Sequence, residues 1–376
     1  MTMERIKHLL TDPEQDYYIY DLTTLEQRIH WLTSTTKHSI YYAVKANSHP
    51  RILETLAPYV AGFEVASPGE IEKVRAVSAT VPMIYGGPVK TRGNLAYALK
   101  HHVKSIQVES LYELDALQFL LADSERSVEV MLRINLSNIE SSAKLKMAGV
   151  PTQFGLPYDD LEEALEICDA TPELQLTGFH FHSMSNNLDE QAHVDFIKNA
   201  TAFAQKYSLR LPADYAINVG GGIGVNYEGE TQFDFETFAS QIEDFPQLTF
   251  ELGRFITAPI GYYATNVYDI KTMHGETFVL LNGGTNHFRF PKAWYHNHPL
   301  DILPTETTSS RVKSIENQQV TLAGKLCTPN DVFGPPYSIK SLKTGDWVIF
   351  KRAGSYAYDI SHLQFLSHNL PKIKFI

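Results

Sequence analysis

The stretch Ser39-Ile40-Tyr41-Tyr42-Ala43-Val44-Lys45 is an apolar run that ends in a lysine. Such a run predicts a buried β-strand. An ammonium group at its end is costly to bury unless another group pairs with it or uses it. Taken alone, Lys45 is best explained as a strand-end lysine whose stem lies on apolar surface while its charge reaches water. Its chemistry therefore has to be judged together with the rest of the chain.

Seven further short apolar runs predict more strands: Gly62–Val65, Met83–Tyr85, Ser105–Val108, Val128–Ile134, Leu176–Phe181, Tyr215–Val219 and Leu248–Glu251. Segments with helical spacing lie between them, and Ser67-Pro68-Gly69-Glu70 has the cap and first-turn residues of a helix start. Eight alternating units predict a TIM-like (β/α)8 barrel, with an open doubly wound sheet as the alternative. We favour the barrel because polar residues follow nearly every strand.

Beyond residue 258 the sequence changes to Tyr-, Val- and Thr-rich runs with turn residues and little helical spacing. This pattern predicts a mostly antiparallel β-sandwich or barrel. We therefore expect a barrel domain over residues 24–258 and a β domain over 1–23 and 259–376. The stretch Pro291–Ser310, with Trp294 and Tyr295, is interpreted as a loop over the site.

Composition indicates an ordinary soluble globular protein. The 376 residues include 43% hydrophobic and 20% charged residues, with a formal net charge of -11. This charge argues against nucleic-acid or anionic-membrane partners. The only two cysteines, Cys168 and Cys327, cannot form a disulfide framework, and neither a signal peptide nor a run long enough to span a membrane is evident. We expect a cytoplasmic protein.

In a barrel, catalytic residues come from the C-terminal ends of different strands. The eight ends carry Lys45, Glu64, Gly86-Gly87, Glu109, Arg133, His182, Gly220-Gly221-Gly222, and Glu251 with Arg254. This set combines an amine, an imidazole, a glycine-rich segment and a carboxylate beside a guanidinium. These are the groups that a pyridoxal-phosphate site needs, with no metal.

The glycine triplet 220–222 could approach a phosphate without side-chain interference, although a triplet alone is more often a tight turn. Glu251 could accept a hydrogen bond from the pyridine nitrogen and Arg254 could balance the phosphate, whereas a structural ion pair is the alternative for these two. His180 and His182 share one strand face. We assign His182 to ring stacking and interpret His180 as a core residue whose hydrogen bonds are satisfied.

The segments Tyr42–Asn47, Gly62–Ser67, His180–Ser185, Glu251–Arg254 and Gly354–Tyr356 are similar to motifs of one family. The chain resembles, over nearly its whole length, the fold-type III pyridoxal-phosphate decarboxylases, which include ornithine and diaminopimelate decarboxylases. The resemblance implies catalytic roles for Lys45, His182, Glu251 and Cys327. It implies cofactor contacts for Lys45, Glu64, Arg133, His182, Ser185, Gly220, Gly221, Gly222, Glu251, Gly253, Arg254 and Tyr356.

The resemblance also implies a homodimer. Lys45 would form the Schiff base with the cofactor. Cys327 matches the cysteine that enters the active site from the other subunit of a head-to-tail dimer and helps to place a proton on the α-carbon after carbon dioxide leaves. Active sites would then lie at the subunit interface.

Departures from the family motifs narrow the range of expected substrates. Thr328 stands where related enzymes carry an acidic residue for the distal ammonium group, and Gln153 replaces a lysine that could pair with Asp331. Residues 182–188 and 326–329 look most like a branch in siderophore biosynthesis, which decarboxylates citryl-diaminopropionate or citryl-serine. We expect Arg289, Thr328 and Asp331 near the substrate, with a solvated loop arginine as the alternative for Arg289.

Other functions stay open. A diaminopimelate or other free amino-acid decarboxylase is the nearest alternative, and Thr328 argues against it. A racemase of this fold type would pair the ring nitrogen with arginine, whereas Glu251 stands here. A non-catalytic regulator and a single-domain cofactor carrier are the remaining possibilities. The retained site residues argue against the regulator, and the β domain argues against the carrier.

Overall fold

The computed structural model describes residues 3–122, 124–136, 145–146, 151–289, 291, 296–306 and 311–376. Its contacts divide the chain into two units. Unit 1 comprises residues 1–25, 226–230 and 257–376, and unit 2 comprises 26–225 and 231–256. The short segment 226–230 leaves the barrel sequence to join unit 1, which no sequence pattern indicated.

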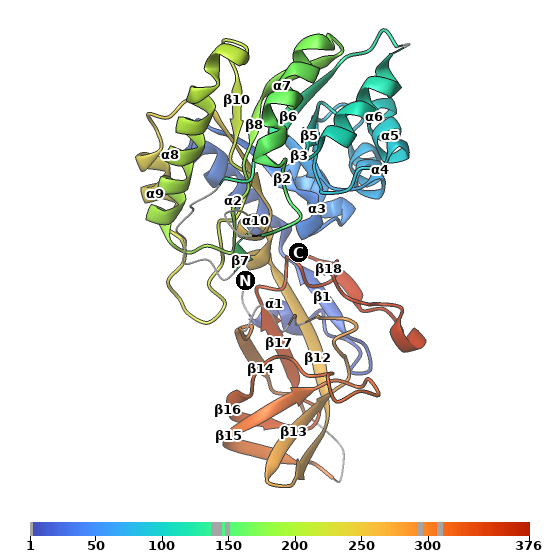
Figure 1. Cartoon of the computed structure of the whole chain (residues 1–376). Helices are drawn as coiled ribbons and strands as arrows, with labels where there is room; N and C mark the ends of the chain where they lie inside the picture. Colours follow the sequence, from blue (N-terminus) through green and yellow to red (C-terminus); the bar gives the residue numbers. More distant parts are fainter. Residues whose placement is uncertain are drawn as a thin grey trace. The chain divides into compact units, whose positions relative to one another are not determined.

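Unit 2 is a closed barrel of eight parallel strands (Figure 1). The strands are β2 (Ser39–Ala43), β3 (Gly62–Val65), β4 (Met83–Tyr85), β5 (Ser105–Val108), β6 (Val128–Arg133), β8 (Leu174–His180), β10 (Ala216–Asn218) and β11 (Leu248–Leu252). The last strand pairs with the first from Thr249↔Ser39 to Leu252↔Tyr42, which closes the barrel. The barrel prediction is confirmed, and the open-sheet alternative is wrong.

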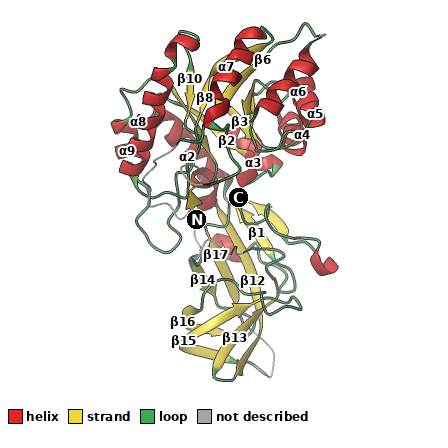
Figure 2. Cartoon of the chain, in the orientation of Figure 1, coloured by secondary structure: helices red, strands yellow, loops and turns green. Residues whose placement is uncertain are grey.

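Helices surround these strands (Figure 2). They are α2 (Leu22–Thr35), α3 (Pro50–Leu56), α4 (Pro68–Val77), α5 (Arg92–Lys100), α6 (Leu111–Leu121), α7 (Leu161–Ala170), α8 (Glu190–Lys206) and α9 (Phe235–Gln241). Two hydrogen bonds close the start of α4: Ser67 Oγ accepts from Glu70 N at 3.2 Å, and Glu70 Oε2 accepts from the N–H of Ala66, the residue before the cap, at 2.7 Å. No particular helix was predicted between Met83–Tyr85 and Ser105–Val108, where α5 lies; the signal that could have found it is the Thr91 cap.

Unit 1 contains an eight-stranded, mostly antiparallel sheet, as predicted. Its strands are β1 (Tyr17–Tyr20), β12 (Gly261–Met273), β13 (Glu276–Leu281), β14 (Leu300–Leu303), β15 (Ser314–Ala323), β16 (Tyr337–Lys343), β17 (Trp347–Lys351) and β18 (Lys372–Phe375). Within this sheet, the pairs β1–β18 and β13–β15 are parallel, and the other strand pairs that the structure describes are antiparallel.

The interpretation of Pro291–Ser310 as a loop is wrong in part. Strand β14 lies inside it and pairs with β17 from Leu300↔Phe350 to Leu303↔Trp347. Its sequence, LDIL, is interrupted by Asp301 and is only partly buried, so it does not form a continuous apolar run and the strand is defined by its partner. Trp294 and Tyr295 of the same stretch lie outside the described residues.

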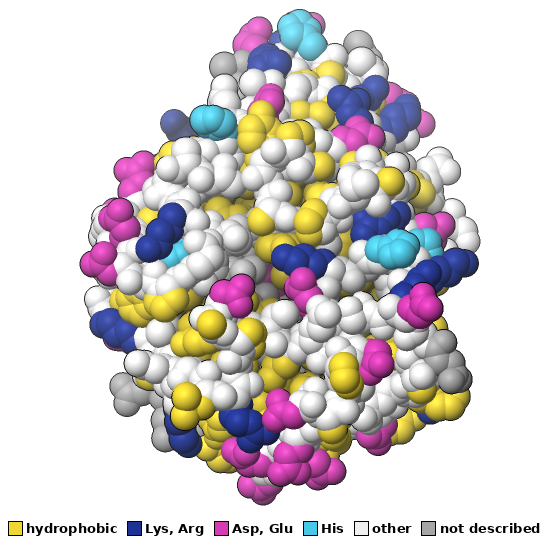
Figure 3. All heavy atoms as spheres, turned by 90° about the horizontal axis from the view of Figure 1, so that it is seen from above, with side chains coloured by type: hydrophobic (Ala, Val, Ile, Leu, Met, Phe, Trp, Pro, Cys, Tyr) yellow, Lys and Arg dark blue, Asp and Glu magenta, His cyan; other side chains and the backbone are white. Residues whose placement is uncertain are grey.

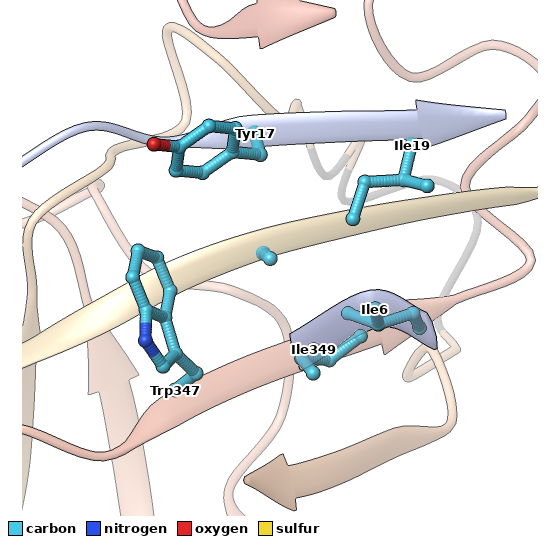
Figure 4. Packing of buried hydrophobic residues seen from close by; sticks show 6 residues of the cluster. Ile6, Tyr17, Ile19, Trp347 and Ile349 are labelled. Atoms are coloured by element: carbon cyan, nitrogen blue, oxygen red, sulfur yellow. The ribbon is translucent and has the colours of Figure 1, made fainter. Parts of the chain in front are cut away.

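A hydrophobic core cluster holds the start of the chain against the sheet of unit 1 (Figure 4). Tyr17 of β1 and Trp347 of β17 meet edge to face with ring centroids 5.8 Å apart. Ile6 of α1 (Met3–Lys7) packs on the same cluster and is buried. Aromatic pairs of this kind contribute roughly 0.5–1.5 kcal/mol beyond the area they bury.

The face that Figure 3 shows is mixed in charge. On the face in Figure 3, Lys and Arg side chains are interspersed with Asp and Glu side chains. Among the helices of the described residues, none combines the length and the apolar character needed to span a bilayer.

Candidate active site

Lys45 lies one residue beyond Val44 in a short 3₁₀ turn that follows β2. Its Nζ is 2.8 Å from Oε2 of Glu64 on β3. The side chain of Lys45 is 43% exposed and that of Glu64 only 4%. The amine is thus paired with a buried carboxylate and also accessible, which a covalent cofactor attachment requires.

Glu251, near the end of β11, is buried among polar partners. Its Oε1 accepts hydrogen bonds from Nε2 of Gln107 and, at 2.7 Å, from Nδ2 of Asn218. Burial raises the pKa of Glu251 to about 7; the Glu64 carboxylate adds to the rise, while Lys45 and the two amides oppose it. The amides take one carboxylate oxygen and leave the other for a further donor.

His182 follows β8 and is neutral. Its Nδ1 accepts a hydrogen bond from the backbone N–H of Gly221 at 3.1 Å, so the ring proton is on Nε2. Burial lowers the pKa of His182 well below its ordinary value, and the charges of Arg133 and Lys45 lower it further. A neutral imidazole held from one edge suits the predicted stacking role.

His180 is 2% exposed, and neither ring nitrogen has a hydrogen-bond partner among the described residues. Nε2 lies 3.7 Å from Oε2 of Glu251. His180 is therefore buried as a core residue is, but the expectation that its hydrogen bonds are satisfied is wrong for the part of the chain that the structure describes. Strand alternation correctly put His180 and His182 on one face, but only the closed barrel brings Glu251 against that face.

The glycine triplet turns sharply. Gly220 and Gly222 have φ of +64° and +101°, which favour glycine. The N–H of Gly220 donates to Oδ1 of Asn218 at 2.8 Å, and that of Gly221 donates to His182. The triplet thus orients two site residues, and its role toward a phosphate remains a prediction.

A buried charge network lies at neighbouring strand ends. Arg133 Nη1 is 2.7 Å from Oε1 of Glu109, whose Oε2 accepts from the N–H of Gly155 at 2.8 Å. The N–H of Glu109 donates to Glu113, which pairs with Lys90 at 2.9 Å. Arg133 thus has its own carboxylate partner, and the predicted contact of Arg133 with the cofactor remains untested.

The other predicted cofactor residues lie in both units. Gly253 is packed so closely that a Cβ atom there would lie 2.7 Å from Cβ of Ala46, next to Lys45. Arg254 begins α10 (Arg254–Thr257), and Ser185 lies in the short strand β9 (Met184–Ser185). Tyr356 is partly buried in unit 1. Their contacts with the cofactor remain predictions.

The predicted substrate and proton-transfer residues belong to unit 1. Cys327 is exposed and its neighbour Thr328 is half-buried. The backbone N–H of Arg289 donates to Oγ of Ser361 at 3.0 Å. Asp331 is buried and accepts hydrogen bonds from residues of the same unit, which indicates a structural role for its carboxylate.

The residues of the barrel fit pyridoxal phosphate. They supply an accessible amine, a neutral imidazole and a carboxylate with one oxygen held by amides. Ligand atoms of His180, His182 and Glu251 lie within 4.8 Å of one another, a spacing that would also suit a metal ion. The two amides on Glu251 bind one carboxylate oxygen and leave the other for a further donor, such as a protonated ring nitrogen.

Sequence reasoning missed Gln107 and Asn218. Both occupy predicted strands, and a polar side chain inside an apolar run is the signal that could have found them. Gln107 is 144 residues from Glu251, so only the closed barrel shows their contact.

Comparisons with known proteins agree with this geometry. The sequence model described as "Pyridoxal-dependent decarboxylase, pyridoxal binding domain" matches residues 22–258. A Staphylococcus aureus protein named 2-[(L-alanin-3-ylcarbamoyl)methyl]-2-hydroxybutanedioate decarboxylase is 45% identical, covering 96% of this chain and 94% of that protein. The L-glutamyl-[BtrI acyl-carrier protein] decarboxylase of Niallia circulans is 31% identical, covering 95% and 88%.

Solved structures share the fold. Helicobacter pylori diaminopimelate decarboxylase complexed with L-lysine has a TM-score of 0.84 at 23% identity, covering 99% of this chain and 94% of that one. Vibrio vulnificus lysine/ornithine decarboxylase complexed with putrescine has a TM-score of 0.82 at 21% identity, covering 100% and 99%. Together with the site geometry and the sequence matches, these findings show that the chain belongs to the pyridoxal-dependent decarboxylases of the ornithine, arginine and diaminopimelate decarboxylase family.

Proposed function

We propose that this enzyme removes the α-carboxylate of an amino-acid unit joined to citrate, within a siderophore precursor. The observation that carries the proposal is the 45% identity, over 96% of the chain, to the S. aureus enzyme. The name of that enzyme describes citrate joined through an amide to diaminopropionate. Citryl-diaminopropionate is accordingly the first substrate to test, and citryl-serine the second.

The barrel residues would divide the work among them. Lys45 would hold the cofactor covalently, with its charge balanced by Glu64 at 2.8 Å. Bound pyridoxal phosphate supplies a ring that, when protonated, accepts the electron pair left by the departing carboxylate. Glu251 would keep the ring nitrogen protonated, and His182 would support one face of the ring as a neutral imidazole.

Residues of unit 1 support the choice of substrate. Thr328 is a neutral hydroxyl, which cannot balance the distal ammonium group of a diamine precursor. A citrate-linked substrate instead presents carboxylates at its far end, for which Arg289 supplies a planar cation. The exposed thiol of Cys327 would deliver the proton to the α-carbon after carbon dioxide has left.

The proposal includes a homodimer in which Cys327 serves the site of the partner subunit. An exposed cysteine in the unit without Lys45 suits this arrangement. Two free cysteines also suit a reducing compartment, so the cytoplasm belongs to the same proposal.

The test is carbon dioxide release by the cofactor-loaded enzyme from citryl-diaminopropionate, citryl-serine, meso-diaminopimelate and ornithine. We expect release from a citrate-linked substrate and at least about 100-fold lower kcat/KM for the free amino acids. Lysine formation from meso-diaminopimelate at a comparable kcat/KM would instead establish the second candidate. That candidate is supported by the 26% identity to the diaminopimelate decarboxylase of Bacteroides thetaiotaomicron.

A further inference from the structure

One carboxylate joins two segments of unit 1. The first segment, residues 283–289, follows β13 and ends at Arg289; the second, residues 324–331, follows β15 and carries Cys327. Oδ1 of Asp331 accepts from the N–H of Thr285 at 2.6 Å and from its hydroxyl at 2.7 Å.

Oδ2 of Asp331 completes the link. It accepts from the N–H of Leu326, the residue before Cys327, at 2.7 Å. Asp331 is 2% exposed, so water does not compete for these hydrogen bonds. Three of the roughly four acceptor positions of the carboxylate are used inside the unit, which leaves little for a substrate.

The cysteine loop is also closed on itself. The N–H of Thr328 donates to Leu326 O at 2.8 Å, and that of Asp331 donates to Thr328 O at 3.2 Å. The N–H of Gly324 donates to Asp331 O at 2.9 Å. Cys327 therefore lies in a loop that is held by hydrogen bonds from Gly324 and Leu326 to Asp331.

The two segments are in direct backbone contact. A Cβ atom on Gly324 would lie 2.5 Å from Cα of Gly284 and would overlap Oδ2 of Asp331. A Cβ atom on Gly284 would lie 2.9 Å from the same oxygen and 3.1 Å from Cγ of Leu326. Glycine at both positions leaves the room that the carboxylate occupies.

We propose that Asp331 is a positioning residue, which holds segments 283–289 and 324–331 as one rigid body. Arg289 and Cys327 are then presented together, so that the cation for the far carboxylates and the proton donor keep a set spacing. The inference rests on the function proposed for these two side chains. It replaces a substrate contact of Asp331 with a hydrogen-bonding role.

The structural test is hydrogen exchange, followed by mass spectrometry, on the cofactor-loaded wild-type protein and the Asp331→Asn variant. The NH2 group of asparagine replaces one acceptor oxygen with a donor, and it then faces the N–H groups that the carboxylate accepted from. We therefore expect hydrogen exchange at the amides of Thr285 and Leu326 to become about tenfold faster or more. Barrel peptides should not change. Unchanged exchange in both segments would overturn the proposal, whatever the substrate is.

Asp346 is a matched control in the same unit. It is 3% exposed and accepts from the N–H groups of Thr305 at 3.0 Å and Lys343 at 2.9 Å. Asp346→Asn should quicken exchange around its own turn and leave segments 283–289 and 324–331 unchanged. Equal quickening of those segments in both variants would mean general loosening of the unit and would reject the specific role of Asp331.

If Asp331→Asn does not fold, Thr285→Val is the second variant. It removes one donor from the first segment only, yet it should quicken exchange at Leu326 in the other segment. An effect confined to residues 283–289 would contradict the link.

The functional test uses citryl-diaminopropionate. We expect Asp331→Asn to lower kcat and raise KM. In the Cys327→Ala background, Asp331→Asn should lower kcat only slightly further. In the Arg289→Gln background, it should raise KM only slightly further. Any effect of Asp346→Asn on kcat or KM should be the same in the Cys327→Ala and Arg289→Gln backgrounds as in the wild-type enzyme. Faster exchange with kcat and KM unchanged would refute the positioning role. If the wild-type enzyme acts on no citrate-linked substrate, the proposed function fails, and the exchange result still decides whether Asp331 links the segments.

Discussion

Nε2 of His180 lies 3.7 Å from Oε2 of Glu251, while Gln107 and Asn218 hold the other oxygen of that carboxylate. Burial, together with the charges of Arg133 and other cations, lowers the pKa of His180 well below its ordinary value, so this neighbour is neutral. The charge of Lys45 and the two neutral amides thus oppose the rise in the pKa of Glu251 that burial causes.

Removing one amide should therefore shift the ionisation of Glu251. In Asn218→Leu the 2.7 Å hydrogen bond is lost, and the pKa of Glu251 should rise by about one further unit. The acidic limb of kcat/KM against pH should move upward by the same amount, with Gln107→Leu as the parallel variant. An unmoved limb in both variants would show that these amides do not set the charge of Glu251.

Lys45→Ala should abolish the near-ultraviolet or visible absorbance band of the lysine-bound cofactor. Decarboxylation should fall by at least about 10³-fold, because the covalent attachment is lost. Lys206→Ala, on α8, is the control, since this lysine contacts Tyr158 on the outside of the barrel. A band that persists in Lys45→Ala would place the attachment on another amine.

The cofactor-free protein should lose stability as pH rises through the range in which Glu251 titrates. The pKa of this carboxyl is 4.5 when unfolded and about 7 when folded, so between these values the folded state binds more protons. Its contribution is complete below about pH 4.5 and is lost by about pH 7, amounting to no more than about 3 kcal/mol.

Urea unfolding of the cofactor-free protein at about pH 5 and pH 7.5 measures this slope. Glu251→Gln should flatten it. Glu70 contributes in the same direction, because burial and the Glu64 carboxylate raise its pKa to about 7. In the double variant, Glu251→Gln with Glu70→Gln, the free energy of unfolding should depend on pH still less. An undiminished pH dependence in that variant would contradict the raised pKa values of these two carboxyl groups.

One thiol per chain should react quickly with a thiol reagent in the native protein. Cys327 is exposed, whereas burial raises the pKa of Cys168 to about 12 and leaves little thiolate. Cys327→Ala should abolish the fast reaction and lower kcat by about 10²-fold without removing the absorbance band. Cys168→Ala should keep both the fast reaction and kcat.

Replacing one partner of the buried ion pair Lys90–Glu113 should destabilise the folded protein. The side chains are 0% and 5% exposed, with Nζ and Oε1 2.9 Å apart. Lys90→Met should lower the free energy of unfolding by roughly 3–5 kcal/mol, because it leaves the carboxylate unpaired. Lys90→Met combined with Glu113→Gln should cost less than the sum of the single changes in urea unfolding, and additive costs would contradict the pairing.

The elements that the sequence predicted best are those with strong local patterns. Strands buried on both sides are continuous apolar runs, so β3, β4 and β5 were predicted with the bounds that the structure has. Helix α4 has a capping serine, a proline and a first-turn glutamate at its start. Strands β14 and β16 were missed because neither is a continuous apolar run: Asp301 interrupts β14, and serines and lysines interrupt β16.

Chain order likewise predicted which residue types stand at the strand ends, because each end follows its own apolar run. Lys45, Glu64, His182 and Glu251 were all identified in this way. Their pairing was not, since it depends on register: Ala43 aligns with Glu64 across β2 and β3, and this brings Lys45 to the carboxylate. Likewise, Gln107 reaches Glu251 only across the closed barrel.

The sequence by itself thus determined the order of strands and helices, the barrel that they form, and the chemical groups at its mouth, because periodicity and residue type are local properties. Only the tertiary structure decided which groups touch, which oxygens are already bound, and how far each pKa moves. It made Asp331 a link between two segments and left the buried ring of His180 facing Glu251. Distances, burial and dielectric surroundings arise when segments far apart in the chain pack together, and no local pattern records them.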